Sequence, residues 1–272
     1  MLILYVPILK NFMKNNIRFQ DAVEIYKKKF SNEKLFNNNL LLIETHVESL
    51  KDWSEIMNLN DLKRLFLKKK KQNKMKTKKI NLKDTKNWIN NKNTGNFHHL
   101  SKNFFSIQGI RVVGTKSREV SGRSWDQPLI IEKKSYGGIL GIIRKKINYI
   151  PYYLIDFKAE PGNPDKIQIS PCLQATFSNI NQLHGGRKPF FSEIFLKPKK
   201  HGYKILFEQL MSEDGGRFYK KKNKGMLIEC IKKKNSIDLK ENFYWLTLFQ
   251  IKYLIKNNSW VNPHVRSIIS HL

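Results

Sequence analysis

The sequence predicts an α+β protein in which a helical N-terminal segment precedes a mostly antiparallel sheet flanked by further helices. From Ile17 to Leu67 the chain contains little glycine or proline and carries apolar residues at helical spacing. From Phe104 to Ile231 it instead breaks into short runs of β-branched and aromatic residues, separated by Gly, Pro, Asn or Asp. The gaps between these runs are too short for helical crossovers, so neighbouring strands are expected to run antiparallel.

The N-terminal segment is expected to form short amphipathic helices. Apolar side chains recur three and four residues apart in two sets, Ala22, Ile25, Tyr26 and Phe30, then Leu59, Leu62, Leu65 and Phe66. Residues 68–79 hold eight lysines in twelve positions, and their mutual repulsion favours a solvated linker or an exposed helix end. We therefore divide the chain into a helical N-terminal extension with its Lys-rich linker, residues 1–79, and a second domain, residues 80–272.

The second domain contains several predicted strands and two predicted C-terminal helices. The strands are Phe104–Val113, Gln127–Ile131, Gly137–Lys145, Tyr152–Glu160, Lys166–Ser170 and Gly225–Ile231. A helix in the run Phe243–Asn258 would place on one face Leu246, Phe249, Tyr253 and Leu254. Asn262 followed by Pro263 is typical of an N-cap with proline at the first helical position, and predicts a last helix through Ile269.

The formal net charge of +29 favours phosphate-bearing partners, either nucleic acid or small anionic ligands. Only 9 of the 51 basic residues are arginine, however, and the lysines accompany many asparagines and isoleucines, as an AT-rich coding sequence would produce on solvated surfaces. Arginine binds phosphate through paired hydrogen bonds, so a nucleic-acid surface would be expected to contain more of it. A nucleic-acid-binding protein is therefore the least favoured of the function hypotheses.

The cysteines and the N-terminal residues bear on the cellular compartment of the protein. Cys172 and Cys230 are too few for a disulfide framework and lie outside any zinc-ligand spacing, which is typical of a reducing cytoplasm. The opening MLILYVPILKNF is apolar but short, and it lacks a preceding basic segment and a small-residue cleavage site. We expect neither a signal peptide nor a membrane span there, and Met13 is an alternative start.

The stretch KAEPGNPDKIQISPCLQATFSN, residues 158–179, carries the pattern of a binding site. Glu160 follows a predicted strand, and two prolines with a glycine between them fix the backbone after it. Uncharged polar side chains then recur at largely alternate positions, so that one strand face would present them to a polar ligand: Gln168, Ser170, Gln174, Thr176, Ser178 and Asn179. A plain rigid turn, with Glu160 accepting backbone N–H groups, is the alternative interpretation.

Further candidates lie next to glycines and aromatic side chains. His184 and Arg187 flank two glycines, which allow close approach to a ligand, although a single histidine is more often structural. Glu213 and Arg217 flank Asp214 and a second glycine pair. Upstream, Arg118 precedes Trp125, whose ring would stack on a base or a sugar.

In its longer motifs the sequence resembles the NDP-hexose 2,3-dehydratase family of deoxysugar biosynthesis. The likeness runs from about Trp88 to Ser270, through TGNFHHLSKNFFSIQGIRV, RE followed by WDQPLI, GILGI, the stretch 158–179, HGG, SEDGGRFYKKKN, NFYWLTLFQIKYLI and VNPHVRSIIS. This resemblance implies a Nudix-like fold, a mixed β-sheet flanked by helices, in a homodimer. The metal box of Nudix hydrolases is missing, because Arg118-Glu119 is followed by Val-Ser-Gly rather than by carboxylates, so no metal is expected.

The resemblance also implies a substrate and a reaction. On a dTDP-4-keto-6-deoxyhexose, a base removes the C3 proton, which the C4 ketone acidifies, and the C2 hydroxyl leaves with help from an acid. The product is a 3,4-diketo-2,6-dideoxy sugar, which an NADPH-dependent 3-ketoreductase would consume in the cytoplasm. No cofactor is needed, in agreement with the absence of a GxGxxG fingerprint, and neither nucleic acid nor membrane is an expected partner.

Site residues are assigned on these motifs. The candidates for acid and base are Glu160, His184 and Glu213, and spacing does not decide which is which. The candidates for the diphosphate are Arg118, Arg187, Arg217 and Lys222, because cations of this kind bind phosphate oxygens well. Further substrate-binding candidates are Trp125, Gln168, Gln174 and Asn179.

Several features depart from the family's pattern. Members usually carry two tandem copies of this unit, and this sequence has one. Cys172 stands where threonine is usual, Met211 and Asp214 replace glutamines, and Pro263 with His264 replaces methionine and aspartate. Two chains would recreate the paired arrangement as a symmetric dimer. The alternative is a catalytically degenerate half that only binds nucleotide sugars.

Overall fold

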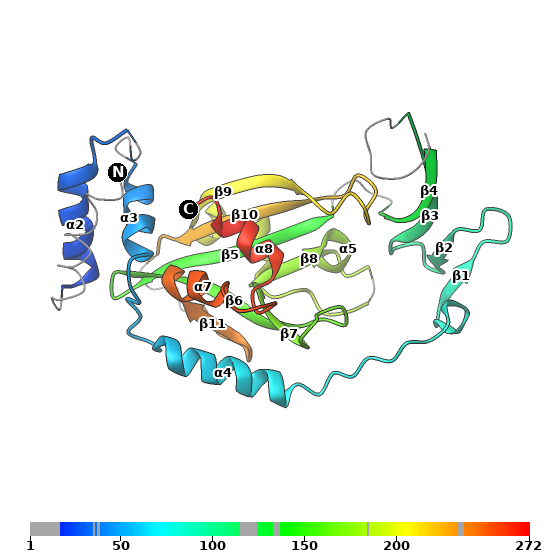
Figure 1. Ribbon diagram of the computed structural model, residues 1–272, viewed down its shortest axis with the longest axis horizontal. Coiled ribbons are helices and arrows are strands. Elements are labelled where there is room, and N and C mark those ends of the chain that lie inside the picture. The colour runs from blue at the N-terminus through cyan, green and yellow to red at the C-terminus, as the bar shows by residue number, and fades with distance from the viewer. Residues whose placement is uncertain are drawn as a thin grey trace.

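The computed structural model describes residues 17–34, 36, 39–114, 124–132, 137–183, 185–232 and 237–272, and every structural statement below refers to these residues. They form two β-sheets with associated helices. A seven-stranded main sheet occupies the middle of the molecule, and a four-stranded small sheet lies to one side of it (Figure 1). The predicted α+β class, with a mixed sheet flanked by helices, is confirmed.

The main sheet has the strand order β11-β6-β5-β10-β9, with β7 paired to β6 and β8 paired to β5. Its strands are β5 (Gly138–Ile147), β6 (Ile150–Ala159), β7 (Ile167–Pro171), β8 (Leu173–Thr176), β9 (Tyr203–Ser212), β10 (Lys222–Cys230) and β11 (Phe243–Leu246). Each described pair is antiparallel except β5 with β10, which run parallel. The expectation of a mostly antiparallel sheet is confirmed.

β5 and β6 pair along only part of their length and then diverge. Ile143 and Leu154 form their last shared pair. Beyond that pair, β6 continues alongside β7 and β5 continues alongside β8. We name this divergence the fork. Cys172 is the one residue between β7 and β8; its thiol donates a hydrogen bond to the Gly141 carbonyl oxygen over 3.3 Å, and burial raises its pKa.

The small sheet consists of four antiparallel strands in chain order, β1 (Trp88–Asn90), β2 (Phe97–His99), β3 (Ser106–Val113) and β4 (Ser124–Ile131). It meets the main sheet at the turn that joins β9 to β10. There the Ile130 N–H donates to the Arg217 carbonyl oxygen at 2.8 Å, and the Tyr219 N–H donates to the Ile130 carbonyl oxygen at 2.9 Å. An ion pair of 2.7 Å between Lys221 and Glu132 adds a third connection.

Helices cover both faces of the main sheet. One face packs against α4 (Leu59–Gln72), α7 (Leu248–Leu254) and α8 (Pro263–Ile269), which share one apolar core with it. The other face packs against the short helix α6 (Ser192–Leu196), whose Phe195 ring lies so close to Gly141 that an added Cβ would be 2.4 Å away. Shorter helical segments are α5 (Phe177–Ile180), Leu82–Asp84 and Lys199–His201. None of the described helices is long and apolar enough to cross a membrane.

Three predicted elements differ from the observed ones. The run after Phe243 begins as strand β11, and α7 starts only at Leu248, because Thr247 and Gln250 form a capping box that fixes the helix start. The polar row in residues 168–179 divides at Cys172 between two strands, and its last two members lie in α5. Of the Lys-rich segment, residues 68–72 extend α4 and only the remainder is non-helical. The predicted cap at Asn262 with Pro263 is confirmed.

The N-terminal helices α2 (Phe19–Phe30) and α3 (Leu40–Glu48) pack against β5 and β6 near the turn that joins these two strands, which we name the closed end. A second apolar core joins them to these strands and includes the buried side chains Tyr26, Phe36, Val47, Ile150 and Tyr152. Burying each side chain of this size contributes roughly 1.5–3 kcal/mol. The proposed division at residue 79 stays a prediction, and this core shows that the extension packs tightly against the strands beyond it.

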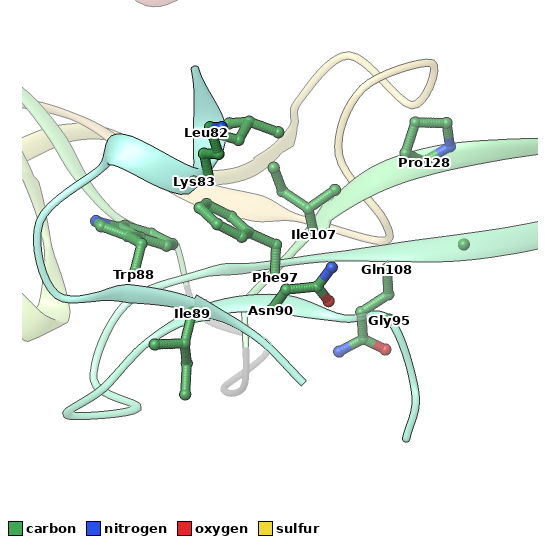
Figure 2. Close-up of a pocket in the computed structure, with 11 residues that line it drawn as sticks. Leu82, Lys83, Trp88, Ile89, Asn90, Gly95, Phe97, Ile107, Gln108 and Pro128 are labelled. Carbon is green, nitrogen blue, oxygen red and sulfur yellow. The ribbon is translucent and has the colours of Figure 1, made fainter. Parts of the chain in front are cut away.

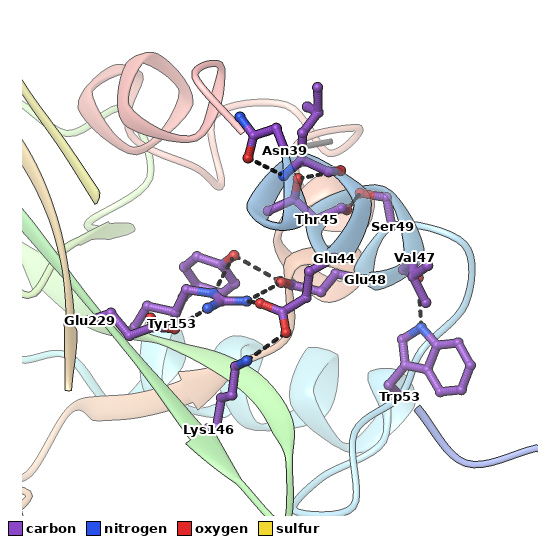
Figure 3. A network of polar contacts seen from close by, with 12 residues as sticks. Asn39, Glu44, Thr45, Val47, Glu48, Ser49, Trp53, Lys146, Tyr153 and Glu229 are labelled. Carbon is purple, nitrogen blue, oxygen red and sulfur yellow. Dashed lines mark hydrogen bonds and ion pairs between the residues drawn. The ribbon is translucent and has the colours of Figure 1, made fainter. Parts of the chain in front are cut away.

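A buried charged cluster lies at the same junction (Figure 3). The Arg144 side chain is 1% exposed and forms ion pairs with Glu44 and Glu48 of α3 and with Glu229 of β10. The Tyr153 hydroxyl donates to Glu48 at 2.7 Å. Burial raises the pKa of Glu48 despite the neighbouring guanidinium, whereas for Glu44 the effect of burial is outweighed by Arg144 and Lys146, so its pKa is lowered.

We expect Arg144→Met to destabilise the fold by roughly 3–5 kcal/mol, because it leaves several buried carboxylates without a cation. The urea midpoint of unfolding measures this loss. Arg111→Met is the matched control, since the Arg111–Asp126 pair on the small sheet is largely exposed and its removal should move the midpoint little. Equal effects of the two substitutions would contradict the assignment of the cluster as a stabilising junction.

Candidate active site

Strand direction gathers polar residues at one end of the main sheet, which we name the site end. β6, β8 and β9 finish there and β5 and β10 start there, because β5 and β10 are parallel and the other three run against them. The site end therefore holds Glu160 after β6, Gln174 in β8, Glu213 after β9 and Asn223 in β10. Helices α2 and α3 lie at the opposite end of the sheet (Figure 1).

Glu160 is held across the fork by residues of β6 and β8. The Gln174 side-chain amide donates to both carboxylate oxygens at 3.1 Å, and Lys158 Nζ lies 3.2 Å from Oε1. The turn after Glu160 is closed by another residue: Asn163 Nδ2 donates to the carbonyl oxygens of Lys158 and Lys166, at 3.1 and 3.3 Å. The Glu160 carboxylate thus contacts side chains, and none of its described hydrogen bonds comes from backbone N–H groups of the turn.

Glu213 lies between β10 and the start of α8. Asn223 Nδ2 donates to its carboxylate, and His264 Nε2 lies 4.0 Å from the same oxygen, Oε1. Burial lowers the pKa of His264, and Lys221 and Lys158 act in the same direction against the opposing carboxylates Glu213 and Glu160. His264 is therefore a neutral ring near pH 7, able to accept a proton. Both predicted carboxylates, Glu213 and Glu160, thus act electrostatically on the His264 ring.

A further carboxylate lies deeper in the fork. Asp156 is two residues before Lys158 on β6, and its cross-strand neighbour on β7 is Ser170. Burial raises the pKa of Asp156 to about 7, with Lys158 opposing and Glu160 adding to the shift. The Ser170 hydroxyl beside it is fully buried and has no hydrogen-bond partner among the described residues. Unpartnered buried polar groups are rare in native proteins, and they often mark a ligand site.

The remaining predicted residues occupy varied positions. Gln168 is buried and its amide donates to the Ser259 carbonyl oxygen at 2.8 Å, so it anchors the C-terminal segment. Asn179, Arg187 and Lys222 are exposed. Lys221, the neighbour of Lys222, has a side chain that is only 13% exposed and pairs with Glu132.

Trp125 and Arg217 lie where the small sheet meets the main sheet. Trp125 Nε1 donates to Gln127 Oε1 at 3.3 Å, and the Gln127 amide donates to the Gly216 carbonyl oxygen at 3.4 Å. The Arg217 side chain is 78% exposed and pairs only loosely with Asp214, at 3.3 Å. Predicted residues Arg118 and His184 lie outside the described residues.

Sequence reasoning missed three residues of the site. Lys158 precedes Glu160 by two residues, so the strand period of two already places it on the same face. The same period of two places Asp156 on this face as well. His264 directly follows the recognised cap at Asn262 and Pro263, and its chemistry depends on a strand end some fifty positions earlier in the chain, which no local pattern shows.

Two cavities formed by described residues lie near this cluster. One of about 590 Å³ lies on the small sheet, where Trp88 and Phe97 stack with ring centroids 5.5 Å apart (Figure 2). Its lining contains no carboxylate or histidine, so it offers no group for proton transfer near neutral pH. Another of about 740 Å³ lies between the 162–164 turn and residues 255–266. Within the described ranges no three His, Cys, Asp or Glu side chains form a metal-binding group.

Comparisons with known proteins give a family model and three curated relatives with related names. A family model described as NDP-hexose 2,3-dehydratase matches residues 59–272. Three proteins named dTDP-4-dehydro-6-deoxy-α-D-glucopyranose 2,3-dehydratase align with the chain. The one from Amycolatopsis orientalis is 33% identical over 79% of this chain and 45% of its own length. Those from Saccharopolyspora spinosa and Streptomyces violaceoruber are 33% and 32% identical, over 73% and 70% of this chain and 39% and 41% of their own lengths.

The chain thus spans less than half the length of these curated relatives, which fits the expectation of a single copy of the unit in this sequence. Among solved structures, the Caenorhabditis elegans Ap4A hydrolase aligns with 50% of this chain and 98% of its own, at 12% identity and a TM-score of 0.29. A likeness this loose decides neither fold nor function. The mixed α+β architecture rests on the strands and helices themselves.

The raised pKa of Asp156 predicts a pH dependence of stability. The folded protein holds this proton more tightly than the unfolded chain, so the stability it contributes is full below a pH of about 4 and is lost as the pH rises through about 7. Asp156→Asn has no proton to lose and is expected to melt at nearly the same temperature at pH 5.5 and 8. Asp238→Asn, at an exposed position, is the control and should follow the wild type. An unchanged pH dependence in Asp156→Asn would refute the shift.

Proposed function

The chain belongs to the NDP-hexose 2,3-dehydratase family, and we propose that it removes the C2 hydroxyl of a dTDP-4-keto-6-deoxyhexose to give a 3,4-diketo-2,6-dideoxy sugar. The observation that carries this proposal is that His264 lies 4.0 Å from Glu213 at the site end, where Glu160 also acts on its pKa. Elimination of water next to a ketone needs one group to take a proton and another to give one. In this proposal, three ionisable side chains at the same end of the sheet supply both functions.

In this proposal Glu160 is the base that takes the C3 proton. Its carboxylate is oriented by two hydrogen bonds from Gln174, and a fixed orientation keeps a base in line with the proton it removes. The acid that assists departure of the C2 hydroxyl is a member of the set Glu213, His264 and His184. A positioned acid or base contributes about a hundred- to ten-thousand-fold to the rate.

The nucleotide would lie across the exposed rim of the site. Arg187, Arg217 and Lys222 are exposed cations that offer N–H donors to a diphosphate. Arg118, which lies outside the described residues, stays a candidate from the sequence. The Trp125 ring would stack on the base or the sugar at the joint between the two sheets. Gln174 links this binding function to the base, because its amide already contacts Glu160.

The proposed reaction uses no metal or redox cofactor, because the net change is loss of water. We place it in the cytoplasm, where an NADPH-dependent 3-ketoreductase would consume the unstable product. We further propose a homodimer, in which two chains provide the two copies of the unit that each longer relative would carry in one chain.

The activity is tested by incubating the purified protein with dTDP-4-keto-6-deoxyglucose, the 3-ketoreductase and NADPH, and following NADPH oxidation. Glu160→Gln keeps the shape of the side chain and most of its hydrogen bonding but cannot take a proton. The rate is therefore expected to fall about a hundredfold or more. Binding of dTDP and the melting temperature should be nearly unchanged. Glu208→Gln on β9 is the matched control and should retain the full rate.

Two outcomes would contradict this assignment. Wild-type protein that binds dTDP without turnover would instead support the nucleotide-sugar-binding function. Normal turnover in Glu160→Gln would remove Glu160 from the mechanism while leaving the activity itself in place.

The dimer is tested by light scattering at micromolar concentration. We expect a particle of twice the 32.2 kDa chain mass. A monomer that is fully active would rule out any requirement for the second chain.

A further inference from the structure

We propose that Lys158 is a further catalytic residue of this site, whose ammonium group donates a hydrogen bond to the C4 carbonyl oxygen of the sugar and stabilises the enolate formed when the C3 proton leaves. The inference rests on the proposed function and adds to it the group that carries the developing negative charge. Enolate formation concentrates charge on this oxygen, and a fixed donor there typically accelerates such steps by about a hundred- to a thousandfold.

Lys158 spans the fork. It extends from β6, and its Nζ donates to the Gln174 carbonyl oxygen on β8 at 3.0 Å and lies 3.2 Å from Glu160 Oε1. An ammonium group has three N–H donors, and the described residues occupy two of them. The side chain is 26% exposed, so the third donor remains reachable by a ligand entering the site end.

The distance between Lys158 and Glu160 fits the reaction. C3 and C4 of the sugar are bonded to each other, so the group that takes the C3 proton and the group that contacts the C4 oxygen must themselves be neighbours. Lys158 and Glu160 are the contacting cation and carboxylate at this point of the fork. Because Gln174 contacts both of them, one residue of β8 fixes the pair.

The surrounding charges favour a single cation at this position. Asp156 precedes Lys158 on β6 and Glu160 follows just after the strand, and Lys158 acts electrostatically on His264 of α8, which lies 4.0 Å from Glu213. Burial lowers the pKa of His264, so the ring adds no competing positive charge near pH 7. Among the described residues, Lys158 is the cation that forms an ion pair with the proposed base.

The step balances without any added reagent. The C3–H bond breaks and its proton passes to the Glu160 carboxylate, while the electron pair moves onto the C4 oxygen and is held by the Lys158 N–H, which keeps its proton. The electron pair then returns and the C2–O bond breaks. The hydroxyl takes a proton from the acid of the site and leaves as water, and the resulting enol tautomerises to the 3-ketone.

The test compares Lys158→Met with Lys158→Gln and with the control Lys224→Met, whose wild-type lysine pairs with Glu208 on the same sheet. Trapped-product rate and deuterium wash-in at C3 of the substrate in D2O are measured with dTDP affinity and melting temperature. Lys158→Met should lower both the product rate and the C3 wash-in by about a hundredfold or more, because both require the enolate. Affinity for dTDP should stay within about threefold, which is less than 1.4 kcal/mol.

Lys158→Gln distinguishes the role of the Lys158 charge from the role of its contacts with Gln174 and Glu160. Its amide still donates to Gln174 and Glu160, so a lysine that only ties the fork together would be replaced by glutamine with full rate and stability, and that result would overturn the inference. A rate lost in Lys158→Gln with the melting temperature retained supports it. The inference would also be overturned if the wild type turns over and the product rate of Lys158→Met lies within tenfold of the wild-type rate. A wild type without turnover or wash-in would overturn the proposed function and this inference together.

Discussion

The divergence of β5 from β6 is the constraint on which the rest of the site depends. Had the two strands stayed paired to their ends, β5 would lie beside Lys158 in place of β8, and the contacts of Gln174 with Lys158 and Glu160 would not form. Because β7 and β8 instead take one partner each, the two arms carry polar side chains toward a shared space. The fork needs a residue that changes partners within one step of the chain, and Cys172 is that residue.

The same strand serves the core and the site in succession. The first six residues of β6 are buried and contribute to three apolar cores, and the first partly exposed residue of the strand is Asp156. At the closed end, Arg144 and its carboxylates attach the N-terminal helices to β5 and β10. A sheet held firmly at one end tolerates unpartnered polar groups at the other, such as the Ser170 hydroxyl, whose cost is met by stability elsewhere.

Much of the fold followed from local sequence patterns, whereas partner choice did not. β-branched runs located β3 to β7 and β10, and helical spacing located the amphipathic faces of α2 and α4. The strand β11 was assigned to a helix because aromatic runs fit both periods when they are short, and only the capping box at Thr247 marks the change. For the site, the motif 158–179 located Glu160 and Gln174. The polar row was not one face, because a change of strand partner at Cys172 depends on contacts far away in the chain.

The lysine-rich segment after α4 acts as a tether of fixed reach. Residues 73–81 are non-helical and run from the end of α4 toward the small sheet (Figure 1). Nine extended residues span at most about 30 Å, so their number limits how far the small sheet can sit from α4. Adding residues to such a tether costs little, because loop-closure entropy grows slowly with length, whereas removing a few would pull β4 away from the turn between β9 and β10. Repulsion between its lysines favours an extended segment, and an extended segment keeps α4 and the small sheet apart.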